Sequence, residues 1–241
     1  MSLGKKLAAE ALGTFLLCFI GAGAICLTAL KGAGYDGLLG VAIAHGLVLS
    51  IAVSATMNVS GGHLNPAVSI AMFLTRRISP ADTLAYVVAQ LAGATVAGAL
   101  VLAMFNGLST SGGESVVRAA VLGTPAYDAA AMSTGKAVFI EACLTFVLLA
   151  AIFGTAVDPR APKIGGFGIG LAVAADILVG SPLTGASMNP ARTFGPGLVA
   201  TLSGNMPQFW AQHAVYWIGP VVGGAVAAVL YDRLILEKRA T

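Results

Sequence analysis

Charged residues are scarce in this chain. Only 10% of its 241 residues are Asp, Glu, Lys or Arg, whereas a soluble globular domain carries about 25%. Hydrophobic residues make up 57% of the sequence, and the mean hydropathy is +0.89. A compact soluble fold of this size cannot bury so much apolar surface. The composition therefore excludes a cytosolic enzyme, a disulfide-rich secreted module and a disordered protein, and it predicts contact with lipid.

Cysteine and net charge are also low. Cys18, Cys26 and Cys143 stand singly in apolar stretches, without the paired spacing or nearby histidines of a metal or redox site. We expect them to be small buried hydrophobic side chains, and we expect no metal and no cofactor. A net charge of +3 gives no reason to expect nucleic acid as a partner. Lys5 and Lys6 precede an apolar stretch too long for a signal peptide, so no cleaved signal is expected.

Long apolar runs are abundant, and they set the fold class. A membrane-spanning helix needs about 20 predominantly apolar residues. The alternation at every second residue that marks a membrane β-barrel is absent. The sequence therefore predicts an all-α membrane protein with six transmembrane helices, at about residues 8–30, 38–58, 82–104, 134–156, 165–183 and 209–231.

Two further apolar segments, residues 66–75 and 190–201, are too short to cross a membrane. Each follows directly on an asparagine within an Asn-Pro-Ala sequence, at Asn65 and at Asn189. Asparagine is a good N-cap, and proline is tolerated at the first position of a helix. A helix of about 10 residues rises about 15 Å, which is half of a roughly 30 Å hydrocarbon core. We predict two re-entrant half-helices that meet near the membrane midplane.

The chain is a tandem repeat. Residues 10–15 (EALGTF) match residues 141–146 (EACLTF), and residues 61–67 (GGHLNPA) match residues 185–191 (GASMNPA). Each half contains three predicted spans, so the second half is inverted relative to the first. We expect a single channel domain over 1–241, with repeat 1 at about 5–106 and repeat 2 at about 133–233. The role of the connecting segment 106–133 stays open.

The distribution of Lys and Arg predicts the orientation. Nine of these residues fall on the side of the N-terminus, Lys238 and Arg239 among them, and four fall on the other side. Because cytoplasmic loops carry the excess of Lys and Arg, both termini are expected in the cytoplasm. The short tails fit a microbial cell (inner) membrane.

The midplane chemistry favours uncharged solutes. Two half-helix N-termini would direct their positive dipole ends to one point, which disfavours cations. The amides of Asn65 and Asn189 can donate hydrogen bonds to a water there, which interrupts a proton-conducting chain of waters. Non-helical backbone at membrane depth is tolerated where it lines a water-filled cavity. The expected vestibule lining is therefore Gly61, Gly62, His63, Thr184 and Gly185.

These motifs resemble those of the aquaporins, the major intrinsic protein family. The resemblance covers essentially the whole chain, from Glu10 through both Asn-Pro-Ala sequences to Pro220. It implies six tilted helices plus two half-helices, one pore in each subunit, and a homotetramer in the lipid bilayer. The implied function is a passive channel for water and small neutral solutes, without enzymatic activity.

The resemblance also implies an outer selectivity filter of four residues. An arginine stands three residues after the second motif's asparagine, and the other three positions follow by counting along the chain. The set is similar to that of plant vacuolar-membrane aquaporins, some of which pass ammonia or urea as well as water. The implied filter residues are His45, Ile177, Ala186 and Arg192.

Two alternative functions stay open. A glycerol or urea facilitator is less favoured, because glycerol-conducting relatives carry an Asp and a Lys where this chain has Thr193 and Gly197. A secondary active transporter also uses inverted repeats and broken helices, but it needs coupling carboxylates beside the site. No Asp or Glu flanks either Asn-Pro-Ala sequence.

Glu10, Glu141 and Asp176 are acidic residues inside the predicted spans, where such groups are usually functional. Glu10 and Glu141 occupy equivalent repeat positions, and we expect each to hold a re-entrant loop through backbone N–H groups. A proton relay is the alternative for this pair. For Asp176 we favour a bond to the long outer loop over a place in the pore wall.

Overall fold

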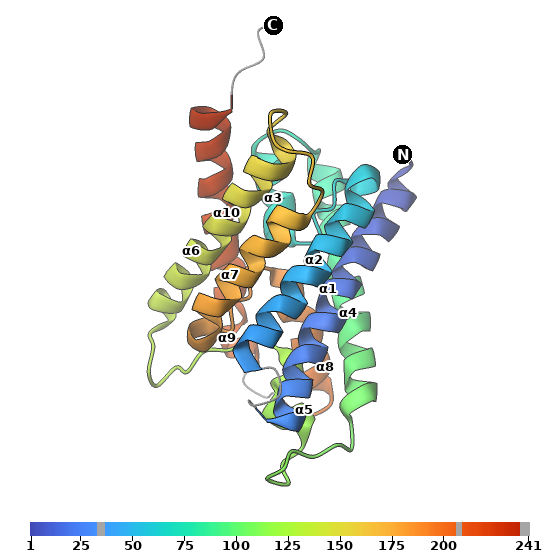
Figure 1. Cartoon of the computed structure of the whole chain (residues 1–241), viewed down its shortest axis with the longest axis vertical. Coiled ribbons are helices and arrows are strands. Elements are labelled where there is room, and N and C mark those ends of the chain that lie inside the picture. The colour runs from blue at the N-terminus through green and yellow to red at the C-terminus, as the bar shows by residue number, and fades with distance from the viewer. Residues whose placement is uncertain (33–36, 206–208, 237–241) are drawn as a thin grey trace, which may run out of the picture.

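Six long apolar helices form the bundle in the computed structural model, which describes residues 1–32, 37–205 and 209–236 (Figure 1). The predicted Lys238 and Arg239 lie outside these residues. Each of the six spans has the length and hydropathy to cross a membrane, which confirms the predicted fold class. They are α1 (Leu3–Lys31), α2 (Gly37–Ser60), α4 (Pro80–Phe105), α6 (Thr134–Ile152) extended by the π-helical turn η2 (Phe153–Val157), α7 (Phe167–Thr184), and α10 (Val215–Leu230) preceded by α9 (Phe209–His213) and extended by the π-helical turn η3 (Tyr231–Ile235).

The two short segments are half-helices, as predicted. Helix α3 (Pro66–Leu74) and helix α8 (Pro190–Leu202) each have an asparagine N-cap and a proline at the first position. The Asn65 side-chain oxygen accepts from the Ala67 N–H at 2.9 Å, and the Asn189 oxygen accepts from the Ala191 N–H at 3.0 Å. Helices α3 and α8 lie in opposite halves of the bundle (Figure 1). The cap residue therefore sets where each half-helix begins.

The half-helices join the two halves of the chain. Helix α1 packs against α2 and α4, while α6 packs against α7 and α10. Across the halves, α2 packs against α7, α8 against α4, and α3 against α10. Glycine permits two of these close approaches, because a Cβ at Gly93 would overlap the Ala11 carbonyl and a Cβ at Gly223 would overlap the Ala142 carbonyl. Small residues of this kind are typical of helix contacts in membranes.

The outward faces of the helices carry large apolar side chains. Ile51, Leu84, Phe139 and Val179 are each 63–69% exposed in the isolated chain, which is the surface expected to meet lipid. Cys18 and Cys26 are buried as expected, but Cys143 is exposed. The expectation for Cys143 was wrong, because this residue lies on the outward face of α6.

The start of α1 and the end of η3 lie at the same end of the bundle (Figure 1). The connecting segment 106–133 packs at the other end and contains two short helical turns, α5 (Val116–Ala119) and η1 (Val121–Gly123). Its apolar side chains pack against α1 and α8. This segment therefore packs onto the bundle at the end opposite the start of α1 and the end of η3.

Candidate functional site: a pore between two re-entrant loops

Glu10 holds the first re-entrant loop, residues 60–65. The side chain is fully buried on α1, and its two oxygens accept four hydrogen bonds. One oxygen accepts from the Ser60 hydroxyl at 2.6 Å and the His63 N–H at 3.0 Å. The other accepts from the Leu64 N–H at 2.6 Å and the Gln90 amide at 2.8 Å. Because every partner donates, this site satisfies the ionised carboxylate.

Glu141 holds the second re-entrant loop, residues 184–189, in the same way. This fully buried carboxylate on α6 accepts from the Thr184 hydroxyl at 2.7 Å and the Ser187 N–H at 2.9 Å with one oxygen. Its other oxygen accepts from the Met188 N–H at 2.8 Å. Both acidic residues therefore make the loop contacts that their repeat positions predict, and their oxygens are occupied by loop donors.

The two loops meet through reciprocal amide bonds. The Asn65 amide donates to the Met188 carbonyl at 2.8 Å, and the Asn189 amide donates to the Leu64 carbonyl at 2.9 Å. Both carbonyl residues have left-handed backbone, with φ of 53° at Leu64 and 54° at Met188. An amide nitrogen carries two hydrogens, and one is used in each of these bonds. The second hydrogen of each asparagine amide has no acceptor among the described residues.

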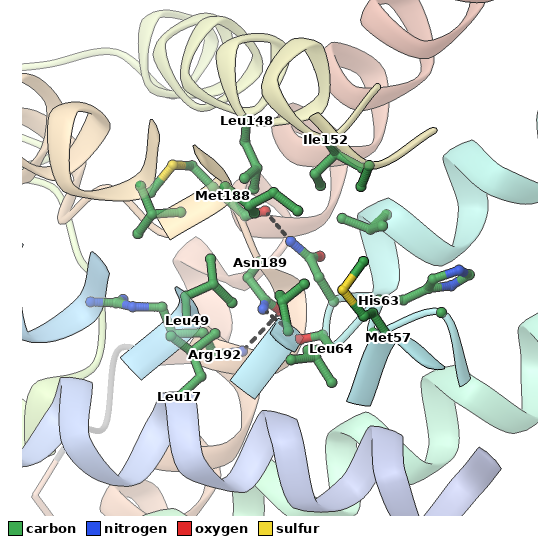
Figure 2. Close-up of a pocket in the computed structure, with 18 of the residues that line it drawn as sticks. Leu17, Leu49, Met57, His63, Leu64, Leu148, Ile152, Met188, Asn189 and Arg192 are labelled. Atoms are coloured by element: carbon green, nitrogen blue, oxygen red, sulfur yellow. Dashed lines mark hydrogen bonds between the residues drawn. The ribbon is translucent and has the colours of Figure 1, made fainter. Parts of the chain in front are cut away.

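A narrow cavity of about 250 Å³ runs past both asparagines. Its walls are largely aliphatic, and Figure 2 shows Arg192 and His63 on opposite sides of the central Asn189. No Asp or Glu is among the residues that line it in the described part of the chain. The predicted site residues that line it are Gly61, Gly62, His63, Asn65, Asn189, His45, Ile177 and Arg192.

His45 and Arg192 form one buried hydrogen-bonded pair. The His45 Nδ1 lies 2.8 Å from the Val41 carbonyl, which can only accept, so this nitrogen carries the proton. The His45 Nε2 is then an acceptor, and it faces Nε and Nη2 of Arg192 at 3.4 and 3.1 Å. A Cβ at Gly21 would overlap the His45 ring, so this glycine makes room for it. His45 thus orients the arginine in addition to lining the cavity.

Three of the predicted residues lie away from this cavity. Thr184 is fully buried. Its hydroxyl donates to Glu141, and its carbonyl accepts from the Tyr216 hydroxyl at 2.8 Å. Ala186 is also fully buried and does not line either cavity found near the loops. Gly185 lines a second cavity, on the side of the 106–133 segment. The second loop therefore lines the pore cavity through Ser187 and Met188 beside Asn189, and not through these three predicted residues.

Asp176 is buried on α7 without a hydrogen-bond donor among the described residues, and its Oδ2 has no partner there. The structure thus shows no bond from Asp176 to the outer segment.

His63 lines the cavity, and its Nδ1 lies 3.1 Å from the Ser69 hydroxyl. Within the described residues no group of three metal-ligating side chains occurs.

Three further residues, which the sequence motifs did not indicate, support the loops. Gln90 bonds both Glu10 and the Ser69 hydroxyl. The Tyr86 hydroxyl donates to the Ser60 carbonyl at 2.8 Å, as Tyr216 does for Thr184 in the second loop. The two tyrosines are separated by an offset close to that of the Glu10 and Glu141 motifs, so the repeat could have indicated them. Gln90 has no such signal.

Beyond the membrane-spanning part, an ion pair closes the turn that follows η2. Arg160 donates to both oxygens of Asp158, at 3.0 and 2.7 Å, and also to the Ile235 carbonyl at 3.0 Å. The Arg160 side chain and backbone hydrogen bonds lower the pKa of Asp158 to about 2. This pair connects the ends of α6 and α10.

Comparisons with known proteins agree with this architecture. A family model described as major intrinsic protein matches residues 1–231. Aquaporin TIP4-4 of Zea mays is 44% identical, with 97% of this chain and 88% of the relative covered. Probable aquaporin TIP3-2 of Arabidopsis thaliana is 41% identical, with 95% and 83% covered.

Among solved structures, the aquaglyceroporin from Plasmodium falciparum matches with a TM-score of 0.83 over 97% of both chains. Its identity of 24% makes this a likeness of fold alone. The family model and the plant relatives cover nearly the whole sequence. The chain therefore belongs to the major intrinsic protein family.

Proposed function

We propose that this chain is a passive channel for water and small neutral solutes, with ammonia and urea as the candidates beyond water. The observation that carries the proposal is the reciprocal pair of amide bonds between the loops. These bonds fix both asparagines while leaving one N–H of each for the solute. The family is one of channels, and several relatives are named aquaporins, so the chain is not an enzyme.

Proton exclusion follows from the direction of these donors. A water at the midplane accepts from Asn65 and Asn189, so its own hydrogens point away along the pore. Neighbouring waters on either side are then oriented in opposite directions, and the hydrogen-bonded relay of protons is interrupted. The N-termini of α3 and α8 add positive potential at the same point. Water passes and a proton does not.

Cation exclusion belongs to the outer part of the pore. Arg192 is buried to 5% exposure and carries a permanent charge at the boundary of the cavity. With no carboxylate among the described lining residues, a cation meets no negative charge to offset the loss of its hydration. We propose His45, Ile177 and Arg192 as the filter, with Ala186 supporting it from behind the wall.

The same lining argues against a secondary active transporter, which needs a coupling carboxylate at the site. Glu10 and Glu141 are occupied by loop donors and do not line the cavity. A glycerol facilitator stays the alternative on solute range. The aliphatic wall opposite the loop carbonyls suits single-file passage of small molecules.

We further propose a homotetramer with both termini in the cytoplasm. The start of α1 and the end of η3 lie at the same end of the bundle (Figure 1). This agrees with the excess of Lys and Arg expected on the side of the N-terminus. The relatives named above come from plants, so the expectation of a microbial cell membrane has no support among them.

Reconstitution into proteoliposomes tests the function. Stopped-flow light scattering should show rapid water flow with a low activation energy, and parallel measurements should rank ammonia, urea and glycerol. Saturating flux with a high activation energy would overturn the channel in favour of a transporter. Faster glycerol than urea flux would favour the glycerol facilitator.

A further inference from the structure

The His45 ring lies against α1 in a space that Gly21 leaves open. Gly21 is buried, and a Cβ built on it would overlap the His45 Nε2 and lie 2.6 Å from the Cδ2 and 3.0 Å from the Cε1 of the same ring. Every residue except glycine carries a Cβ, so the ring keeps its place only with glycine at position 21. Leu17, one turn earlier on the same face of α1, lines the pore cavity (Figure 2). This face of α1 is therefore turned toward the pore.

The ring atom nearest to a Cβ at position 21 is the same nitrogen that accepts from Arg192. The His45 Nδ1 is bound to the Val41 carbonyl, which leaves Nε2 as the acceptor. Nε2 faces Nη2 of Arg192 at 3.1 Å and Nε at 3.4 Å. A methyl group at position 21 would therefore push this acceptor away from the arginine.

A shift of α2 cannot make room for the displaced ring, because the backbone of α2 is also in close contact with α7. A Cβ at Gly46, the residue after His45, would lie 2.7 Å from the Gly170 carbonyl oxygen, and a Cβ at Gly170 would overlap the Gly46 carbonyl oxygen. Helix α2 is thus held between α1 and α7 at the level of His45. The side of the ring that is left open is the pore cavity, which His45 lines. A displaced ring therefore moves toward the passage.

Displacement of the ring would narrow the filter in two ways. The imidazole itself would enter the passage, and the Arg192 side chain would lose its hydrogen-bond acceptor among the described residues. A narrower single file excludes a wide solute before it excludes water. We propose that Gly21 is a positioning residue of the filter. By leaving room for His45 it keeps Arg192 at the pore wall, and it thereby sets the largest neutral solute that passes.

This proposal rests on the channel function proposed above, and solute flux into proteoliposomes tests it. Ammonia, urea and glycerol are measured beside water, and the largest of them that the wild type passes is the reporter. In Gly21→Ala its flux should fall about tenfold, because each passage must overcome the overpacking of the ring. Water flow should fall by no more than about threefold, since water needs the least width. Should water alone pass in the wild type, water flow itself should fall about tenfold.

Gly23 supplies the matched control on the same helix. A Cβ at Gly23 would have no neighbouring atom within 4 Å among the described residues. Gly23→Ala should therefore leave every flux within about twofold of the wild type. A loss in Gly23→Ala equal to that in Gly21→Ala would assign the effect to α1 in general and overturn the proposal.

A double-mutant cycle separates the proposed role from a general packing defect. In His45→Ala the ring is gone, so the further change Gly21→Ala should alter solute fluxes by no more than about twofold. Thermal unfolding in detergent gives a second readout that does not depend on flux. Gly21→Ala should lower the melting temperature in the wild-type background and leave it unchanged in the His45→Ala background.

The outcomes separate this proposal from the channel function. Unchanged fluxes in Gly21→Ala, equal losses of water and a larger reporter solute, or losses that persist in the His45→Ala background overturn the proposal and leave the channel standing. If Gly21→Ala aggregates, a folded double variant supports the proposal and an aggregated one overturns it. Wild-type vesicles without water flow overturn the channel and the proposal with it.

Discussion

The two re-entrant loops, residues 60–65 and 184–189, have the same supports and different chemistry. In each, a buried glutamate accepts from a hydroxyl and two backbone N–H groups, and a tyrosine hydroxyl donates to the first carbonyl. Three residues after the asparagine, however, the first half-helix carries Val68 and the second carries Arg192. The two half-helix starts therefore share their supports and differ in charge at this position.

The supports also differ in one respect. Glu10 receives a fourth hydrogen bond, from Gln90, whereas the described residues give Glu141 three. The Gln90 Oε1 is buried and has no partner among the described residues. The first loop therefore holds a spare acceptor that the second loop lacks. Matched substitutions in the two loops, and one substitution outside them, test how far the likeness and the difference extend.

The largest effect is expected from Glu141→Gln. Either orientation of the new amide leaves a backbone N–H of Ser187 or Met188 facing an N–H₂ group, which should lower the free energy of unfolding by about 3 kcal/mol. In Glu10→Gln, the Gln90 amide can turn its free oxygen toward the new N–H₂. That loss should be smaller by about 1 kcal/mol. Unfolding from mild detergent into SDS measures both, and equal losses would break the comparison.

Arg192→Val makes the second half-helix resemble the first at this position. Removal of the buried positive charge should raise proton and cation leak about tenfold, a barrier change of about 1.4 kcal/mol. Water flow should persist, because both asparagine amides stay in place. Collapse of a pH gradient in vesicles with a trapped dye measures the leak. Val68→Ala is the matched control at the first loop, and an unchanged leak in Arg192→Val would contradict the assigned role of the charge.

A smaller effect concerns the left-handed backbone in the loops. Gly62 and Ala186 occupy equivalent positions with φ of 62° and 45°. Gly62→Ala should cost about 1 kcal/mol, since a Cβ there would also lie 3.1–3.3 Å from Thr56 and Met57. Ala186→Gly relieves the strain but gives the unfolded chain more freedom, so its net effect should stay within about 0.5 kcal/mol. Thermal unfolding in detergent compares them, and a larger loss for Ala186→Gly would reverse the prediction.

The smallest effect is expected outside the loops, at Asp158. Its folded pKa of about 2 lies below the ordinary 3.8, so its contribution to stability is full above pH 4 and declines as the pH falls toward 2. The difference in melting temperature between wild type and Asp158→Asn should therefore be constant from pH 5 to 8 and shrink below pH 4. A difference that changes between pH 6 and 8 would assign the pH dependence to another group.

Much of the architecture could be predicted because each signal is local or repeated. Apolar length predicts the spans, and the capping chemistry of Asn65 and Asn189 places the half-helix starts at the residues where the structure has them. The repeat offset indicated Glu10 and Glu141. Gln90, by contrast, reaches Glu10 across 80 positions of sequence, and nothing in its surroundings indicates a partner.

The sequence alone determined that the chain crosses a membrane, that two half-helices enter it, and that one arginine stands beside the second. Those conclusions rest on apolar length, on capping and on spacing, which are properties of neighbouring residues. Only the tertiary structure decided which hydrogen-bonding side chains already have a partner within the protein. It joins His45 to Arg192, turns Thr184 toward Glu141, and leaves Thr124 without a partner among the described residues. Hydrogen-bond satisfaction depends on contacts between distant segments, and local sequence carries no record of them.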